Sequence, residues 1–78
     1  MPTVLEINGF KFKFFSNEND EPIHVHIIKG GGNAKIWLDP VIVEEYSYNF
    51  TVQQRREIRR LVRENAEILK RAWDDYFA

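Results

Sequence analysis

The chain has 78 residues, enough for one small domain with a single core, and its hydrophobic content of 44% is ordinary for a globular protein. It has no cysteine, which excludes disulfides and thiolate metal ligands, and its net charge of −1 argues against a strongly basic nucleic-acid-binding protein. No apolar stretch approaches the roughly 20 residues that span a bilayer, and no signal-peptide pattern is present, so we expect a soluble cytoplasmic protein.

The first two predicted strands form a hairpin. Residues 3–7 (TVLEI) are short and alternating, and Asn8-Gly9 follows, the strongest two-residue hairpin signal. Residues 10–15 (FKFKFF) then alternate between phenylalanine and lysine, which predicts a strand with one apolar and one basic face. The apolar face holds Phe10, Phe12 and Phe14, and the basic face holds Lys11 and Lys13. A polar loop, SNENDEP, ends this region.

Two further predicted strands flank a glycine-rich turn. Residues 23–29 (IHVHIIK) and 34–39 (AKIWLD) both alternate, and Gly30–Asn33 is predicted as the turn between them. One face holds Ile23, Val25, Ile27, Ala34, Ile36 and Leu38; the other holds His24, His26, Ile28, Lys35, Trp37 and Asp39. After Pro40, the segment VIVEEYSY predicts one more strand.

The second half of the chain is predicted to be helical. Thr51 and Gln54 form a capping box, and apolar residues recur at helical spacing from Ile58 to Tyr76. Asn65 falls on that apolar stripe, and a single helix of some 26 residues is long for so small a domain. We therefore favour two helices broken near residues 64–66. Trp73 is predicted to belong to the core.

The predicted architecture is α+β, with an antiparallel meander of four to five strands and a C-terminal helix or broken helix pair on one face, in a single domain over residues 1–78. The other face of the sheet then has no cover. If Gly30–Asn33 is a four-residue turn, His24 faces Asp39 and His26 faces Trp37, with Cβ atoms about 4.5–5.5 Å apart.

Three interpretations of this open face compete. An imidazole–carboxylate pair among Lys11, Lys13 and Lys35 resembles the acid, base and cations of a ribonuclease, and Trp37 would stack on a base. A His-x-His pair with Asp39 could also hold a metal ion, but typical sites need three or four protein ligands, so no metal and no cofactor is predicted. The third interpretation is a solvated sheet face without chemistry.

The arginines of the predicted helix form a second candidate surface. Residues 51–78 carry seven basic against five acidic residues, a net of +2, whereas residues 1–50 carry four against seven, a net of −3. The arginines are Arg55, Arg56, Arg59, Arg60 and Arg63. Like charges at i and i+4 repel, and cations near a helix start oppose its dipole, so the cluster indicates an acidic partner or RNA. The alternative is a solvated helix face.

Several of these motifs together resemble a known family. They are the start Met1-Pro2-Thr3, the strand Pro22-x-His24-x-His26, the tryptophan strand after the glycines, and Glu64-Asn65…Leu69…Trp73. The family consists of small bacterial proteins with a domain of unknown function, regarded as toxins of type II toxin–antitoxin pairs. Its usual motif is Pro-Pro-His-aromatic-His, from which Glu21 and Val25 depart. The resemblance implies a small protein partner and points to His24 and His26.

Two functions follow as hypotheses. The first is a toxin–antitoxin-like protein that acts on or binds RNA, with His24, His26 and Asp39 as catalytic candidates beside the lysines and Trp37. The alternative is a non-catalytic interaction module that docks an acidic partner through the five arginines. Whether the protein is an enzyme is left open. An exposed edge strand also makes a homodimer possible.

Overall fold

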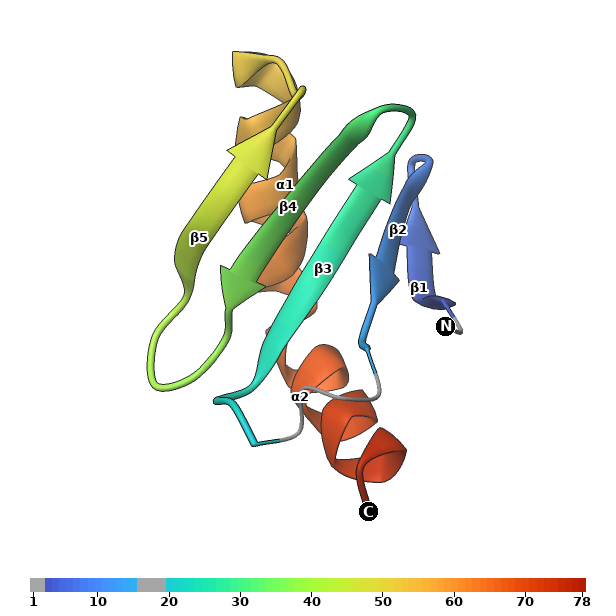
Figure 1. The fold of residues 1–78 in the computed structure, drawn as a ribbon, viewed down its shortest axis with the longest axis vertical. Helices are drawn as coiled ribbons and strands as arrows, with labels where there is room; N and C mark the ends of the chain where they lie inside the picture. Colours follow the sequence, from blue (N-terminus) through green and yellow to red (C-terminus); the bar gives the residue numbers. More distant parts are fainter. Residues whose placement is uncertain (1–2, 16–19) are drawn as a thin grey trace.

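The first half of the chain forms a sheet and the second half forms two helices. The computed structural model describes residues 3–15 and 20–78. In chain order the elements are β1 Thr3–Ile7, β2 Phe10–Lys13, β3 His24–Lys29, β4 Gly32–Trp37, β5 Val43–Tyr48, α1 Val52–Glu64 and α2 Ala66–Tyr76. The strands form one antiparallel sheet in sequence order, so the predicted α+β fold with a meander is confirmed (Figure 1). The motif residues Met1 and Pro2, and part of the predicted polar loop, lie outside the described residues.

The two tight hairpins follow from their turn residues. Asn8 and Gly9 both have positive φ, 54° and 82°, as a two-residue turn of the primed type requires, so this hairpin is confirmed. Between β3 and β4, Lys29 pairs with Gly32, which leaves only Gly30 and Gly31 in the turn. The prediction of a four-residue turn is therefore wrong.

A glycine is needed at the start of β4 for a packing reason. A Cβ atom on Gly32 would lie 2.5 Å from the Cε1 atom of Phe50, far inside van der Waals contact. The Phe50 ring thus lies directly against this backbone. The ring leaves no room for a side chain at the third glycine, a constraint that the sequence pattern does not reveal.

Both predicted features of the helices are present. The Thr51 hydroxyl accepts a hydrogen bond from the Gln54 amide at 3.0 Å, and the Gln54 side chain accepts one from the Thr51 amide at 2.8 Å. The helix breaks at Asn65, as expected. The Asn65 side chain donates to the carbonyl of Leu61 at 2.8 Å, so it satisfies the last turn of α1 and does not cap α2.

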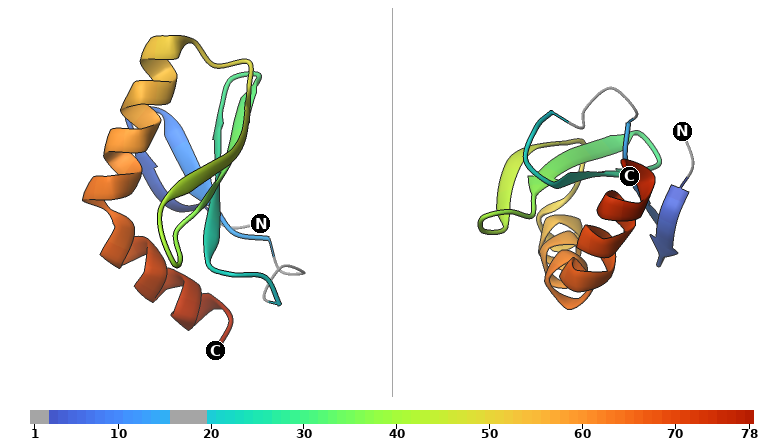
Figure 2. Two further views of the ribbon diagram at one scale, coloured as in Figure 1. Left: turned by 90° about the vertical axis from the view of Figure 1, so that its left-hand side faces the viewer. Right: turned by 90° about the horizontal axis from the view of Figure 1, so that it is seen from below.

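Both helices lie on the same side of the sheet, with α1 along it and α2 near its lower end (Figure 2). The predicted inner face of the sheet is buried, since Phe10, Phe12, Phe14, Val25, Ile27, Ala34, Ile36 and Leu38 are at most 1% exposed. The helices contribute Ile58, Leu61, Val62, Leu69 and Trp73 to the same core. The Phe14 ring meets the Trp73 ring at 5.3 Å, and this contact joins the end of the sheet to α2.

Both edge strands carry an irregularity. The pairing register shifts by one residue between Thr3 and Leu5 in β1, and it skips Glu45 in β5. Such irregularities interrupt the free edge of a sheet and discourage uncontrolled strand pairing. Within residues 3–15 and 20–78, no helix has the length and apolar character needed to cross a membrane.

Candidate functional site

Both histidines are buried, although their face of the sheet was expected to be open. His24 is 0% exposed and His26 is 8% exposed. His24 is the first residue of β3, near α2, and its ring centroid lies 5.1 Å from those of Trp37 and Trp73 and 5.2 Å from that of His26. Since the neighbouring rings come from both the sheet and α2, His24 is a packing residue as well as a polar one.

The protonation of one His24 nitrogen is fixed by its partner. The Nδ1 atom lies 2.9 Å from the carbonyl oxygen of Pro22, and a carbonyl can only accept a hydrogen bond. Nδ1 therefore carries the hydrogen and donates it. This bond holds the ring in one orientation at the start of β3.

The predicted pair of His24 and Asp39 does not form. His24 pairs with Trp37 across the two strands, and His26 pairs with Lys35. The reason is the two-residue turn, which shifts every pairing between β3 and β4 by two positions. Asp39 lies beyond the end of β4 and is exposed. The structure thus brings His24 and His26 together but leaves Asp39 apart from the predicted pairing.

Glu21 is the carboxylate that the sequence reasoning missed. Its Oε1 atom accepts a hydrogen bond from Lys35 Nζ at 2.9 Å and lies 3.9 Å from His24 Nδ1. The shorter contact shows that Glu21 principally pairs with the lysine, because 3.9 Å exceeds a hydrogen bond. The only signal in the sequence was that Glu21 lies three residues before His24. Its contact with Lys35 depends on how the loop before β3 packs, which the sequence pattern does not show.

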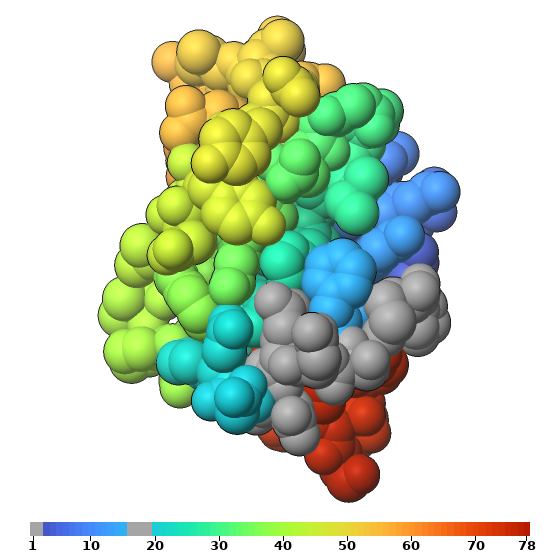
Figure 3. Space-filling model, viewed as in Figure 1, coloured from blue at the N-terminus to red at the C-terminus, as the bar shows by residue number. Residues whose placement is uncertain are grey.

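The side of the sheet away from the helices carries polar and aromatic residues in cross-strand rows. One row runs Glu6, Lys11, Ile28, Asn33 and Tyr48, and the next runs Lys13, His26, Lys35 and Tyr46. In the view of Figure 3, β3, β4 and β5 lie at the front and α1 appears only at the margin. We call the residues Lys11, Lys13, Lys35, Trp37, Tyr46 and Tyr48 the open sheet face.

The aromatic rings on the open sheet face differ in their contacts and in their exposure to solvent. Trp37 donates from Nε1 to Glu45 at 2.8 Å, and Lys35 Nζ lies 4.5 Å from its ring centroid, so this indole is held on two sides. Tyr46 and Tyr48 stack on each other at 5.3 Å with an interplanar angle of 26°. Tyr48 is 58% exposed, which leaves it the most accessible of the three rings. Sequence reasoning chose Trp37 and missed both tyrosines.

The arginines of α1 do not form a uniformly available surface. Arg55 bonds to Glu44 at 2.7 Å, and Arg59 lies 3.9 Å from the same carboxylate. Arg60 bonds to Glu64 at 3.0 Å. Only Arg56 and Arg63 have no ion pair among the described residues, so three of the five predicted binding arginines are engaged within the domain.

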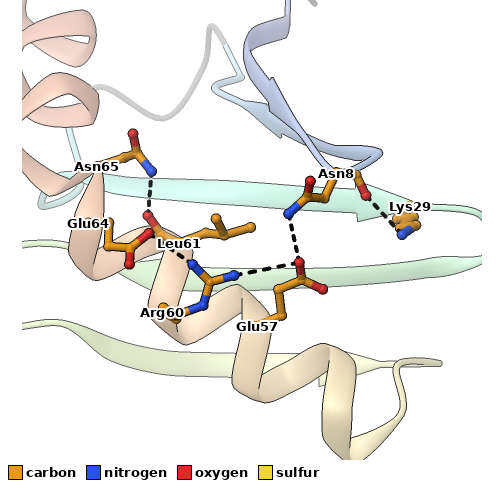
Figure 4. A network of polar contacts seen from close by, with 7 residues as sticks. All are labelled: Asn8, Lys29, Glu57, Arg60, Leu61, Glu64 and Asn65. Carbon is orange, nitrogen blue, oxygen red and sulfur yellow. Dashed lines mark hydrogen bonds and ion pairs between the residues drawn. The ribbon is translucent and has the colours of Figure 1, made fainter.

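Arg60 belongs to a polar network that ties α1 to the β1–β2 turn (Figure 4). It lies 3.7 Å from Glu57, whose carboxylate accepts a hydrogen bond from the Asn8 side chain at 2.8 Å. Lys29 in turn donates to the Asn8 carbonyl at 2.9 Å. This network positions the helix against the hairpin, which gives Arg60 a structural role.

Metal-ligand clusters and surface hollows are two further kinds of candidate site. In the described part of the chain, no group of three histidine, cysteine, aspartate or glutamate side chains is placed to hold a metal ion. A hollow of about 290 Å³ lies on α2 and is lined by Glu67, Ile68, Arg71, Ala72 and Asp75. None of the predicted site residues lines it.

A family model, the domain of unknown function DUF4160, matches residues 9–74. No curated protein and no solved structure matches the chain.

Proposed function

The chain belongs to the DUF4160 family, whose domain has no known function, and from this premise we propose that it binds single-stranded RNA on the open sheet face. One observation carries the proposal: on the sheet face away from the helices, the exposed side chains of Lys11 and Tyr48 share one cross-strand row, and the half-buried Lys13 and Tyr46 lie in the next. Single-stranded RNA is bound by this combination, because bases stack on aromatic rings and phosphates pair with cations.

The dimensions of the face suit a short strand of RNA. The lysines of β2 and the tyrosines of β5 are separated by three strand spacings, roughly 14 Å. Lys11 and Lys13 have no ion pair among the described residues and are free to meet phosphates. Tyr48 presents an exposed ring at the other end. Phosphates at β2 and a base at β5 would thus be bound together.

The proposal is for binding rather than for cleavage. A ribonuclease needs a base and an acid that reach the ribose and the leaving group. His24 has no exposed surface, and Asp39 is not paired with it. For this reason the proposal keeps the RNA part of the hypothesis and leaves out its catalytic part.

Fluorescence anisotropy with a labelled single-stranded RNA of about 12 nucleotides, within the range that one binding domain covers, tests the proposal. Tyr48→Ala should weaken binding about tenfold or more, because a base loses its stacking partner. Lys11→Ala should weaken binding less and reduce its salt dependence, since each phosphate contact contributes a slope of about −0.7 for single strands.

Two control variants lie on α2. Ile68 is 59% exposed, which matches Tyr48 at 58%, and Arg71 is an exposed cation without an ion pair among the described residues. Ile68→Ala and Arg71→Ala should both bind RNA as the unchanged protein does. Unchanged binding by Tyr48→Ala would show that the open sheet face is not the site. Equal weakening by Arg71→Ala and Lys11→Ala would show the same.

The resemblance to toxins of toxin–antitoxin pairs adds a setting to this proposal. We propose that RNA binding at the open sheet face is the step by which the protein would act as a toxin. This role is tested by measuring the growth of a bacterial host after expression of the protein is induced.

A further inference from the structure

Exposed apolar side chains gather at one edge of the molecule. Six large apolar residues are exposed in the described part of the chain, and four of them, besides Tyr48 of the open sheet face, fall within residues 41–52. Val41, Ile42 and Val43 are consecutive and are 62%, 36% and 49% exposed, and Val52 at the start of α1 is 63% exposed. A run of three exposed apolar residues is costly in a soluble domain unless it has a function.

The adjoining flank of α1 carries the two arginines that lack ion pairs. Arg55 and Arg59 reach Glu44 of β5, so this flank of the helix faces the β5 edge. Val52 lies seven residues before Arg59 and therefore on the same stripe of the helix. Arg56 and Arg63 follow Val52 and Arg59 at a spacing of four, which places them beside that stripe.

We propose that this edge docks a segment of a different, acidic protein. We define the β5-side surface as Val41, Ile42, Val43, Val52, Arg56 and Arg63. Apolar side chains of the partner cover the valines and Ile42, and its carboxylates pair with Arg56 and Arg63. Because β5 has six residues, the segment is of the order of 20 Å long when extended.

Charge complementarity selects the partner. Glu44, the β5 carboxylate beside this flank, pairs with Arg55 and Arg59, so the exposed Arg56 and Arg63 remain available to the carboxylates of another molecule. A second copy placed edge to edge would bring its own Arg56 and Arg63 to the same region and add repulsion. RNA would supply negative charge, but the aliphatic run Val41–Val43 offers no ring on which a base could stack.

The partner is also not held by a regular strand ladder. The register of β5 skips Glu45, so the edge does not present an uninterrupted row of main-chain groups. Side chains at the two ends of β5 and along α1 therefore carry the contact. Substitutions of those side chains should remove binding without changing the sheet.

Three labelled 15-residue peptides serve as probes. The first alternates leucine and glutamate, the second replaces glutamate by lysine, and the third replaces leucine by serine. The leucine–glutamate peptide should bind, and the other two should bind about tenfold or more weakly, because each lacks one of the two recognised features. Amide NMR shifts on binding should map to residues 41–44 and 52–63.

Matched variants separate the two features. Val43→Asp should weaken binding of the leucine–glutamate peptide about tenfold, and so should the double variant Arg56→Glu with Arg63→Glu. The effect of the double variant should be larger at low salt, because charge interactions are then screened less. The controls lie on the exposed side of α2: Ile68→Asp replaces an exposed apolar side chain, and Arg71→Glu reverses an exposed charge. Both should leave binding of the peptide unaltered. Circular dichroism of every variant shows that the fold is retained.

The proposal is overturned if no peptide binds, if the lysine peptide binds as well as the glutamate peptide, or if the shifts map elsewhere. A concentration-dependent doubling of mass that Val43→Asp abolishes would assign the surface to a second copy instead. Shifts of residues 41–44 and 52–63 with the RNA probe would assign it to RNA. These readouts are independent of Tyr48→Ala, so RNA binding and partner docking can fail separately.

Discussion

His24 shows how burial changes the expected role of a single residue. The sequence alone indicates that His24 is a catalytic candidate on an open sheet face. In the structure the ring is fully buried between Trp37, Trp73 and His26 and donates to the Pro22 carbonyl. Removing it would leave a cavity and an unpaired carbonyl, so the substitution would affect stability first.

We therefore predict that His24→Ala lowers the free energy of unfolding by about 2–4 kcal/mol, as other large-to-small substitutions in cores do. Urea unfolding followed by tryptophan fluorescence measures this change. Lys11→Ala, on the open sheet face and exposed, should stay within about 0.5 kcal/mol of the unchanged protein. A His24→Ala variant as stable as Lys11→Ala would contradict the packing role.

At the scale of elements, the β3–β4 hairpin determines which side chains meet on the sheet. Its two-residue turn places Trp37 opposite His24 and Lys35 opposite His26. The turn ends at Gly32, which pairs with Lys29 and has no room for a side chain because the Phe50 ring occupies that space. Phe50 lies outside the hairpin, and its ring packs against the strand residue at which the register of β3 and β4 begins.

We predict that Gly32→Ala destabilises the fold by about 1–3 kcal/mol, because a Cβ atom would overlap the Phe50 ring. Gly31→Ala is the matched control, since nothing lies within 4 Å of a Cβ atom at that position. Thermal unfolding by circular dichroism compares the two. Equal melting temperatures would mean that Phe50 moves aside freely and does not constrain the turn.

At the scale of the whole molecule, the helices leave two adjoining surfaces exposed. The open sheet face belongs to the side of the sheet that the helices do not cover (Figure 2), and it meets the β5-side surface where Trp37 pairs with Val43. The two proposals together would give a small domain one surface for RNA and another for an acidic protein, as the proposed role of a toxin restrained by a partner requires. The two proposals are compatible because no residue belongs to both surfaces.

We predict that induced expression of the protein slows the growth of a bacterial host and that Tyr48→Ala relieves this effect at matched soluble levels. The reason is that Tyr48 supplies the exposed ring of the proposed RNA surface. Growth curves with Ile68→Ala as control measure the effect. Harmless expression of a protein that still binds RNA in vitro would refute the toxin role and leave RNA binding standing.

Local patterns in the sequence were sufficient to predict the elements of the fold. Strict alternation in residues 10–15 predicted which phenylalanines are buried, Asn8-Gly9 predicted the first hairpin, and Thr51 with Gln54 predicted the start of α1. These signals depend on neighbours within a few positions, so the chain carries them by itself. The break at Asn65 was predictable for the same reason.

Only the tertiary structure decided which of the predicted surfaces are available. The burial of His24 by Trp73, the pairing of Glu21 with Lys35 and the pairing of Arg55 with Glu44 all join residues from separate elements. No spacing in the sequence encodes them, because they depend on the register of a hairpin and on the side of the sheet that the helices cover. The sequence by itself determined the elements and their core residues, whereas long-range packing determined which polar groups remain free to bind.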